Sequence, residues 1–190
     1  MSDINAQLQD ILAQLQSLNE RVALIEARQM LVPDIERYGK LQQFLVQGNF
    51  KEADEETLRV ILETASRTRD TLTPEDMMQF PANVIRVLDR LWRNYSGDRF
   101  GFSIQVKLYF AAGGSINTLR TQDVETIRKF GELVGWRHQE EWRINDYDNW
   151  DFSLAAPEGC FPALWWKSPY GLKMITFCFT RLLECDLGVS

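Results

Sequence analysis

Apolar residues near the start of the chain recur in alternating steps of four and three residues. They are Ile4, Leu8, Ile11, Leu15, Leu18, Val22 and Ile25, and the positions between them are rich in Gln, Asn, Glu and Asp. This spacing is the heptad seam of a coiled coil. Gln29 occupies the next seam position, and Pro33 ends the predicted helix because proline lacks the backbone N–H that a helix interior requires. Residues 1–33 are therefore predicted to form one coiled-coil helix.

A helix with so narrow an apolar stripe needs a partner. Docking on a globular surface usually requires a wider stripe, so the strict period favours self-association over folding back on the rest of the chain. We expect an oligomerisation helix that makes the protein a homo-oligomer through residues 4–29. Ile and Leu are mixed at both seam positions, which leaves both a dimer and a trimer open. A different coiled-coil protein is a further possible partner.

The remaining residues, 34–190, are predicted to form one helical domain. Five stretches have the apolar spacing or the start signals of a helix. They run from Ile35 to the Gly48–Asn49 pair, from Lys51 to about Ser66, from Pro74 to Phe80, from Asn83 to Tyr95 and from Val124 to Val134. Thr73 is placed to cap the third of these, with Pro74 at the first helical position. No stretch alternates with the period of two that half-buried strands show, so the predicted fold class is all-α.

Irregular segments interrupt this helical pattern. Gly113 to Gln122 is expected to be a mobile connection, and His138 to Trp150 a structured loop. The apolar run from Met174 to Phe179 fits a buried strand or a helix, and we favour a helix. Several aromatic residues stand in irregular segments near Gly or Pro, where they are not all expected to reach the core. Each of them either fixes a loop or helps to line an apolar groove for a flat ligand: Trp136, Trp142, Trp150, Trp165 and Trp166.

Composition and charge narrow the class of partner. The chain has 190 residues, 45% of them hydrophobic, which is enough for a core and excludes general disorder. The formal net charge of −6 argues against nucleic acid as a partner, because phosphate binding needs a concentrated basic face. Residues 1–20 lack the apolar centre of a signal peptide, and no stretch has the ~20 consecutive apolar residues of a membrane span. We expect neither a leader nor a membrane span.

The residue types of a catalytic or metal site are scarce. His138 is the only histidine, and no phosphate loop or nucleophile motif occurs. Three cysteines without a CxxC pair are expected to be free, mostly buried thiols: Cys160, Cys178 and Cys185. Acidic residues cluster in the first turn of one predicted helix, where they suit the positive end of its dipole: Glu52, Asp54, Glu55 and Glu56. We predict no enzyme, no catalytic residue, no metal site and no required cofactor.

Six short sequence motifs occur in a characteristic order between residues 50 and 162. They are Phe50–Thr57, Phe80–Pro81, Leu91–Trp92, Asp98–Gln105 with the sequence DRFGFSIQ, Val134–Arg137, and Ala156–Pro162 with the sequence APEGCFP. In this order they closely resemble the genomes-uncoupled-four family, the tetrapyrrole-binding accessory proteins of magnesium chelatase. The resemblance extends from about Tyr38 to about Pro162.

The resemblance implies a helical domain shaped like a cupped hand, with protoporphyrin IX or magnesium protoporphyrin IX as the possible ligand of an apolar palm. The contact residues that it implies in this chain are Met77, Phe80, Phe102, Trp142 and Trp165. The family follows its Ala-Pro-x-Gly block with paired arginines for the two propionates. The corresponding segment here, Ala163 to Gly171, offers Lys167 instead, and a lysine lacks the bidentate fork of arginine. The histidine of that block is replaced by Cys160.

Two functions are compatible with these residues. The first is a tetrapyrrole-binding regulatory protein of chlorophyll biosynthesis, and so of photosynthesis, that acts with the large subunit of magnesium chelatase. The second is a divergent paralogue that serves as an oligomeric protein-interaction scaffold without binding porphyrin. The resemblance further implies a cytoplasmic protein, as in a cyanobacterium, or a stromal protein if the gene lies in a plastid.

Overall fold

The computed structural model describes residue 14, residues 35–185 and residue 187. The predicted coiled coil over residues 1–33, with its seam at residues 4–29, lies outside these residues except for Gln14. The coiled coil and the domain boundary after residue 33 therefore stay predictions. The chain divides into two compact units, residues 1–39 and residues 40–190. All packing described below is within the second unit.

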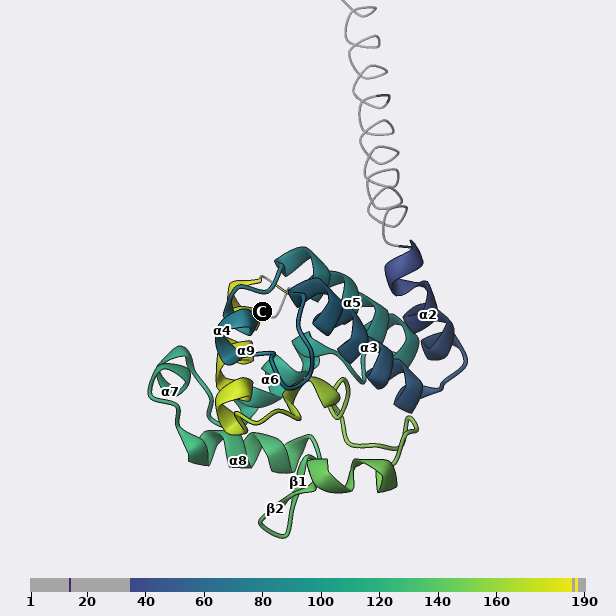
Figure 1. Ribbon diagram of the computed structural model, residues 1–190. Coiled ribbons are helices and arrows are strands. Elements are labelled where there is room, and N and C mark those ends of the chain that lie inside the picture. The colour runs from purple at the N-terminus through teal and green to yellow at the C-terminus, as the bar shows by residue number, and fades with distance from the viewer. Residues whose placement is uncertain (1–13, 15–34, 186, 188–190) are drawn as a thin grey trace, which may run out of the picture. The chain divides into compact units, whose positions relative to one another are not determined.

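The described part of the chain is mainly helical (Figure 1). Its helices are α2 (Ile35–Val46), α3 (Phe50–Ala65), α4 (Pro74–Met78), α5 (Ala82–Ser96), α6 (Phe102–Ala111), α7 (Ile116–Arg120), α8 (Val124–Leu133) and α9 (Leu172–Glu184). Two short strands, β1 (Arg137–His138) and β2 (Glu141–Trp142), and two 3-10 helices, η1 (Arg143–Asn149) and η2 (Leu164–Trp166), complete it. The predicted all-α class is confirmed. Among the described residues, no helix has the length and apolar character needed to cross a membrane.

The helices at α3, α4, α5 and α8 begin and end close to where the sequence predicts them. α3 stops at Ser66, which adopts a left-handed conformation with φ 52° and closes the helix end. α4 begins with the predicted cap: the Thr73 side chain accepts a hydrogen bond from Asp76 N, and Asp76 accepts one from Thr73 N. This reciprocal pair is a capping box, with Pro74 at the start of the helix.

The expectation of an irregular connection over residues 113–122 is wrong, whereas the expected structured loop over residues 138–150 is present and contains short regular elements. Residues 113–122 contain α7, whose first turn is fixed by a capping box between Ser115 and Thr118. The segment after α8 contains a small antiparallel hairpin in which Arg137 pairs with Trp142 and His138 with Glu141. Two residues between the strands allow only a tight turn, and both have positive φ there. Neither element is long enough to show a periodic apolar pattern.

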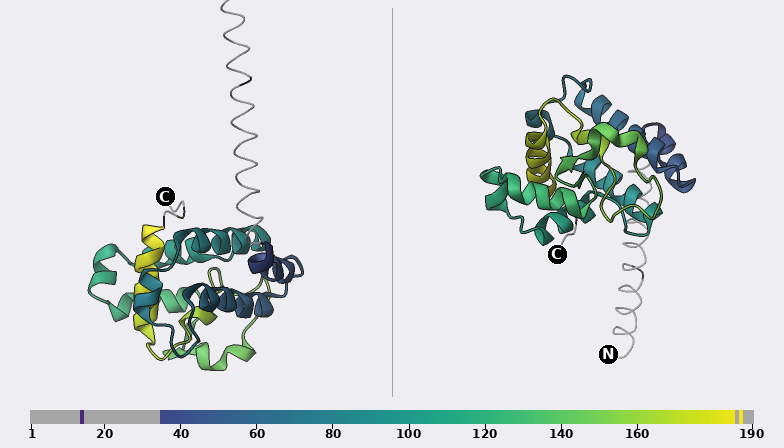
Figure 2. Two further views of the ribbon diagram at one scale, coloured as in Figure 1. Left: turned by 45° about the horizontal axis from the view of Figure 1, so that its top comes forward. Right: turned by 90° about the horizontal axis from the view of Figure 1, so that it is seen from below.

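Helix α9 is the centre of the packing in the second unit. It lies against α4, α6, α7, α8 and η2, and Figures 1 and 2 show it close to α4. Its buried residues include Met174, Ile175, Cys178, Phe179 and Leu182, a series in steps of one, three, one and three. A helix places this series on one face. The preference for a helix over a strand is therefore confirmed.

Glycine 101 shows why the Phe-Gly-Phe block has this sequence. Its φ of 138° is unfavourable for other residues, and a Cβ at this position would lie 2.9 Å from Asp89 Oδ1. Gly101 N donates a hydrogen bond to Phe161 O at 3.0 Å. The ring of Phe161 meets that of Phe100 edge-on, with centroids 5.2 Å apart. The close backbone approach thus joins the Phe-Gly-Phe block to the Ala156–Pro162 block.

Candidate functional site

The six predicted contact residues differ sharply in exposure. Met77, Phe80 and Phe102 each expose 2% of their surface, and Trp165 exposes 1%. Trp142 and Lys167 are only partly buried. Four of the six therefore belong to the core in this structure and offer almost no surface to a ligand. Their assignment to a ligand stays a prediction.

The structure brings together the predicted residues of β2, α6 and η2. The Phe102 and Trp165 rings lie 6.4 Å apart between centroids, and Trp165 meets Trp136 at 6.0 Å. Trp136 stacks on Trp166 at 5.3 Å with an interplanar angle of 28°. Trp166 in turn contacts Trp142 at 5.4 Å. A continuous row of aromatic rings results.

Met77 and Phe80 belong to a different contact, the one between α4 and α9. Arg181 Nε of α9 donates a hydrogen bond to Phe80 O at 2.8 Å. At the other end of this contact, Lys173 Nζ lies 3.1 Å from Glu75 Oε1. Both predicted residues are thus core residues that attach α4 to α9.

Not all aromatics of the irregular segments reach the core, as expected, because Trp142 is only partly buried. More of them do so than the sequence suggests. Trp136, Trp150, Trp165 and Trp166 are buried. They reach the core because side chains of the helices satisfy the backbone of the segment that carries them. Gln105 Nε2 of α6 donates to Gly159 O at 3.0 Å and to Pro162 O at 2.8 Å.

The carboxylate of Asp54 on α3 holds the same segment from the other side. It accepts hydrogen bonds from Tyr147 Oη at 2.9 Å, Ala163 N at 2.9 Å and Leu164 N at 3.2 Å. Asp54 is fully buried, and this loss of hydration raises its pKa to about 7 despite these donors. The dipole interpretation of the acidic first turn therefore misses the role of Asp54. Its spacing of three from Thr57 and four from Leu58, both buried, is the signal that predicts an inward position.

Cys160 and His138 differ in exposure. Cys160 is buried, and burial raises the pKa of its thiol, so it is held as the neutral form. His138 is exposed on β1. All three cysteines are free and buried, as predicted. Nowhere in the described part of the chain do three or more His, Cys, Asp or Glu side chains gather as metal ligands do.

Lys167, the predicted propionate partner, follows η2, and Asp148 is an acidic residue near it. Asp148 Oδ1 lies 2.6 Å from Lys51 Nζ. Lys51 first, and Lys167 to a smaller extent, hold the pKa of Asp148 below its usual value. Asp148 is therefore the ion-pair partner of Lys51, and Lys167 acts on it only from a longer distance.

A groove lies along α3 and the connection that leads to α4. It has a volume of about 470 Å³, and its lining residues are mainly charged and polar, with Leu58 and Leu62 as the apolar residues. The lining includes Glu55, Leu58, Arg59, Leu62, Arg67 and Arg69. The first turns of α3 hold η2 through Asp54, and the later turns form this groove. We call it the α3–α4 groove.

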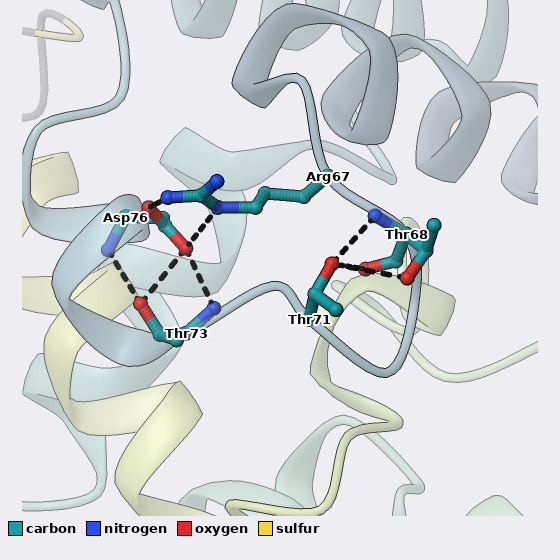
Figure 3. A network of polar contacts seen from close by, with 5 residues as sticks. All are labelled: Arg67, Thr68, Thr71, Thr73 and Asp76. Carbon is teal, nitrogen blue, oxygen red and sulfur yellow. Dashed lines mark hydrogen bonds and ion pairs between the residues drawn. The ribbon is translucent and has the colours of Figure 1, made fainter.

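Local hydrogen bonds order the connection that borders this groove (Figure 3). Arg67 donates two hydrogen bonds to the Asp76 carboxylate, from Nε and Nη2, at 3.0 Å each. This guanidinium lowers the pKa of Asp76 to about 2. Asp76 is also the capping partner of Thr73. Thr68 N donates to Thr71 Oγ1 at 2.9 Å and closes the turn between them.

The sequence interpretation does not find the arginines of this connection. Arg67 and Arg69 stand between the end of one predicted helix and the cap of the next. A polar stretch of that kind is most often a solvated loop, so composition does not single it out. The available signal is two arginines within three residues beside a capping box whose Asp76 can hold one of them.

Comparison with known proteins places the chain among relatives. A family model described as GUN4-like matches residues 33–174. A Ycf53-like protein of Synechocystis sp. is 30% identical over 131 residues, covering 67% of this chain and 51% of that protein. A protein named "Tetrapyrrole-binding protein, chloroplastic" of Arabidopsis thaliana is 31% identical over 124 residues, covering 56% of this chain and 43% of that protein. The chain thus spans about half the length of the curated relatives it matches.

A solved structure shares the fold. The ligand-free structure of Arabidopsis thaliana GUN4 superposes with a TM-score of 0.58 at 20% sequence identity. The match covers 76% of this chain and 94% of the other.

Proposed function

Because the chain belongs to the GUN4-like family, we propose that it binds a tetrapyrrole, with protoporphyrin IX and magnesium protoporphyrin IX as the favoured ligands. The observation that carries this proposal is the similarity to an Arabidopsis relative that is named for tetrapyrrole binding. In keeping with that family, we propose a regulatory role in chlorophyll biosynthesis, with the large subunit of magnesium chelatase as the partner. No catalytic role is part of the proposal.

The chemistry of the α3–α4 groove supports a ligand of this kind. A tetrapyrrole of the protoporphyrin type combines a flat apolar ring with two carboxylates. The groove combines Leu58 and Leu62 with arginines, and its volume of about 470 Å³ is within the usual ~300–1,000 Å³ of ligand sites. Trp165 and Lys167 lie next to the same helix, because η2 packs on α3.

The energetics make the carboxylates decisive. Burial of roughly 400 Å² of macrocycle at about 25 cal/mol/Å² yields on the order of 10 kcal/mol. Immobilisation of the ligand offsets much of this gain. A charge-assisted hydrogen bond to each propionate contributes about 1.5–3 kcal/mol. Affinity should therefore depend on which cations meet the propionates.

The predicted contact residues are part of this proposal on one condition. Trp142 and Lys167 have exposed surface that a ligand can touch. Met77, Phe80, Phe102 and Trp165 are covered, so they contact a ligand only if η2 or α4 moves away from the core. Ligand binding by these four residues is then coupled to opening of the domain.

A second function is favoured by one specific pattern, the heptad seam of residues 4–29. It suits an oligomeric interaction module, in which the helical domain has been kept for assembly. Lys167 in place of paired arginines agrees with that alternative, because lysine binds a carboxylate with less geometric specificity.

A tryptophan-fluorescence titration tests the proposal. Protoporphyrin IX and magnesium protoporphyrin IX are added to the full chain, with haem and a bilin run beside them. We expect saturable quenching at micromolar concentrations or below for the porphyrins. A free tryptophan derivative at equal absorbance corrects for light absorbed by the ligand. If the quenching never saturates, the tetrapyrrole proposal is wrong and the interaction module is favoured.

A further inference from the structure

The three arginines of the α3–α4 groove differ in whether a carboxylate of the protein pairs with their guanidinium group. Arg59 Nε donates to Glu56 Oε1 at 2.7 Å, and its guanidinium also pairs with Glu63. Arg67 is held by both oxygens of Asp76. Arg69 forms no hydrogen bond or ion pair with any other residue that the structure describes. Arg69 is therefore the arginine of this groove with a charge left for a ligand.

The backbone that carries Arg69 is already ordered. Arg69 lies within the Thr68–Thr71 turn. Two positions before it, Arg67 pairs with Asp76 of the α4 capping box (Figure 3). A fixed backbone reduces the conformational entropy that ligand binding would cost. The side chain of Arg69 itself is partly buried at the groove. Both features favour a preformed contact.

The acidic residues of the groove give the contact a direction. Glu63 is paired with Arg59, whereas Glu55 is one turn into α3, at the end next to η2. Ser66 lies eleven positions after Glu55, which corresponds to about 16 Å along the helix axis. An anionic group is thus repelled from the Glu55 end and attracted to the Arg67–Arg69 end.

We propose that Arg69 binds a propionate of the tetrapyrrole, while the ring lies along the later turns of α3 beside the partly exposed Leu62. This inference rests on the proposed function and assigns one of its ionic contacts to a residue of the α3–α4 connection. Arginine fits this task because its fork matches a carboxylate bidentately. Lys167, which lacks this fork, is then the weaker of the two cations available to the ligand.

The test compares a charged and an uncharged porphyrin on matched variants of the full chain. Protoporphyrin IX and its dimethyl ester, which lacks both carboxylates, are titrated into wild type, Arg69→Gln and Arg120→Gln in the same detergent. Arg120 is an exposed arginine of α7 outside the groove. We expect Arg69→Gln to weaken binding of the free acid about tenfold, or about 1.4 kcal/mol. Arg120→Gln should leave it unchanged, and the ester should bind wild type and Arg69→Gln alike.

The outcomes separate this inference from the function on which it rests. Unchanged affinity of Arg69→Gln for the free acid overturns the Arg69 contact and leaves tetrapyrrole binding in place. Equal losses for the acid and the ester also overturn it, because the effect would then not depend on a carboxylate. Failure of wild type to bind either porphyrin overturns both proposals. Circular dichroism of each variant confirms that its helical content is retained.

Discussion

Two connecting segments meet α3, and they are held in opposite ways. Residues 143–166 are fixed by buried acceptors and donors on the helices, chiefly Asp54 and Gln105. Residues 66–73 are fixed by their own exposed hydrogen bonds, such as those of Arg67 with Asp76. The first segment fills the core with tryptophans, and the second leaves a groove beside it.

The contrast shows what each kind of hydrogen bond can do. A buried polar group that loses its partner cannot turn to water, so the first segment is tied to global stability. An exposed group can exchange its partner for water at little cost, so the second segment is free to carry a binding residue. The candidate ligand contacts should therefore be sought where stability depends least on the local structure.

The largest effect is expected from Asp54→Ala. It leaves Tyr147 Oη, Ala163 N and Leu164 N without their buried acceptor. We expect a loss of about 3–5 kcal/mol in the free energy of unfolding, as for other broken buried networks. Urea denaturation followed by tryptophan fluorescence measures it. Glu52→Ala, which removes an exposed acid of the same first turn, is the control and should change stability by less than about 0.5 kcal/mol.

An equal result for the two variants would contradict the comparison. It would mean that the acidic turn acts through the helix dipole alone, as a sequence interpretation suggests.

A pH dependence of intermediate size follows from the same carboxyl group. Burial raises the pKa of Asp54 from 3.8 to about 7, so the folded protein binds this proton more tightly than the unfolded chain. Its stabilising effect is complete below pH 3.8 and is lost as the pH rises through about 7. Between pH 5 and pH 8 the free energy of unfolding should fall by about 2–3 kcal/mol more in wild type than in Asp54→Asn.

Urea denaturation of both proteins at the two pH values provides the measurement. The buried Asp89, whose pKa is also raised by loss of hydration, is present in both proteins and cancels in the difference. Parallel pH profiles would show that Asp54 is ionised throughout this range.

The smallest effect is expected from Asp76→Ala in the second segment. It removes the capping partner of Thr73 and the exposed ion pair with Arg67. Together these losses should lower the free energy of unfolding by about 1–2 kcal/mol. Hydrogen exchange should accelerate at the amides of residues 67–73 and not at those of residues 160–166. Asp70→Ala in the same connection serves as the matched control, with exchange unchanged. Acceleration in both segments would show that the two are coupled.

Much of this architecture is predictable from the sequence. Thr73 and Pro74 predict the start of α4, and the polar residues after Ala65 predict the end of α3, because helix caps are local sequence signals. The blocks around Gly101 and Pro162 predict the family and hence the fold. The helix over residues 172–184 follows from its apolar run, although only the continuation to Leu182 separates it from a strand.

What the sequence does not predict depends on contacts between distant residues. The burial of Trp136, Trp165 and Trp166 requires Gln105 and Asp54 to satisfy an irregular backbone more than fifty residues away in the chain. The same distance hides the role of Asp54 in an otherwise ordinary acidic turn. Arg69 is missed for a different reason: its polar surroundings are typical of a solvated loop, and the capping box beside it does not by itself indicate a ligand.

The stacked pair of Trp136 and Trp166 has an optical consequence. Two indoles with centroids 5.3 Å apart and nearly parallel planes couple their electronic transitions. Held in the chiral interior of the protein, such a pair gives two bands of opposite sign in the far-ultraviolet circular dichroism, where the strongest indole transition lies. The amplitude of this signal depends on the distance and angle between the ring of Trp136, just before the hairpin, and the ring of Trp166 in η2. The protein therefore carries its own label for movement of the segment between them, without any dye attached.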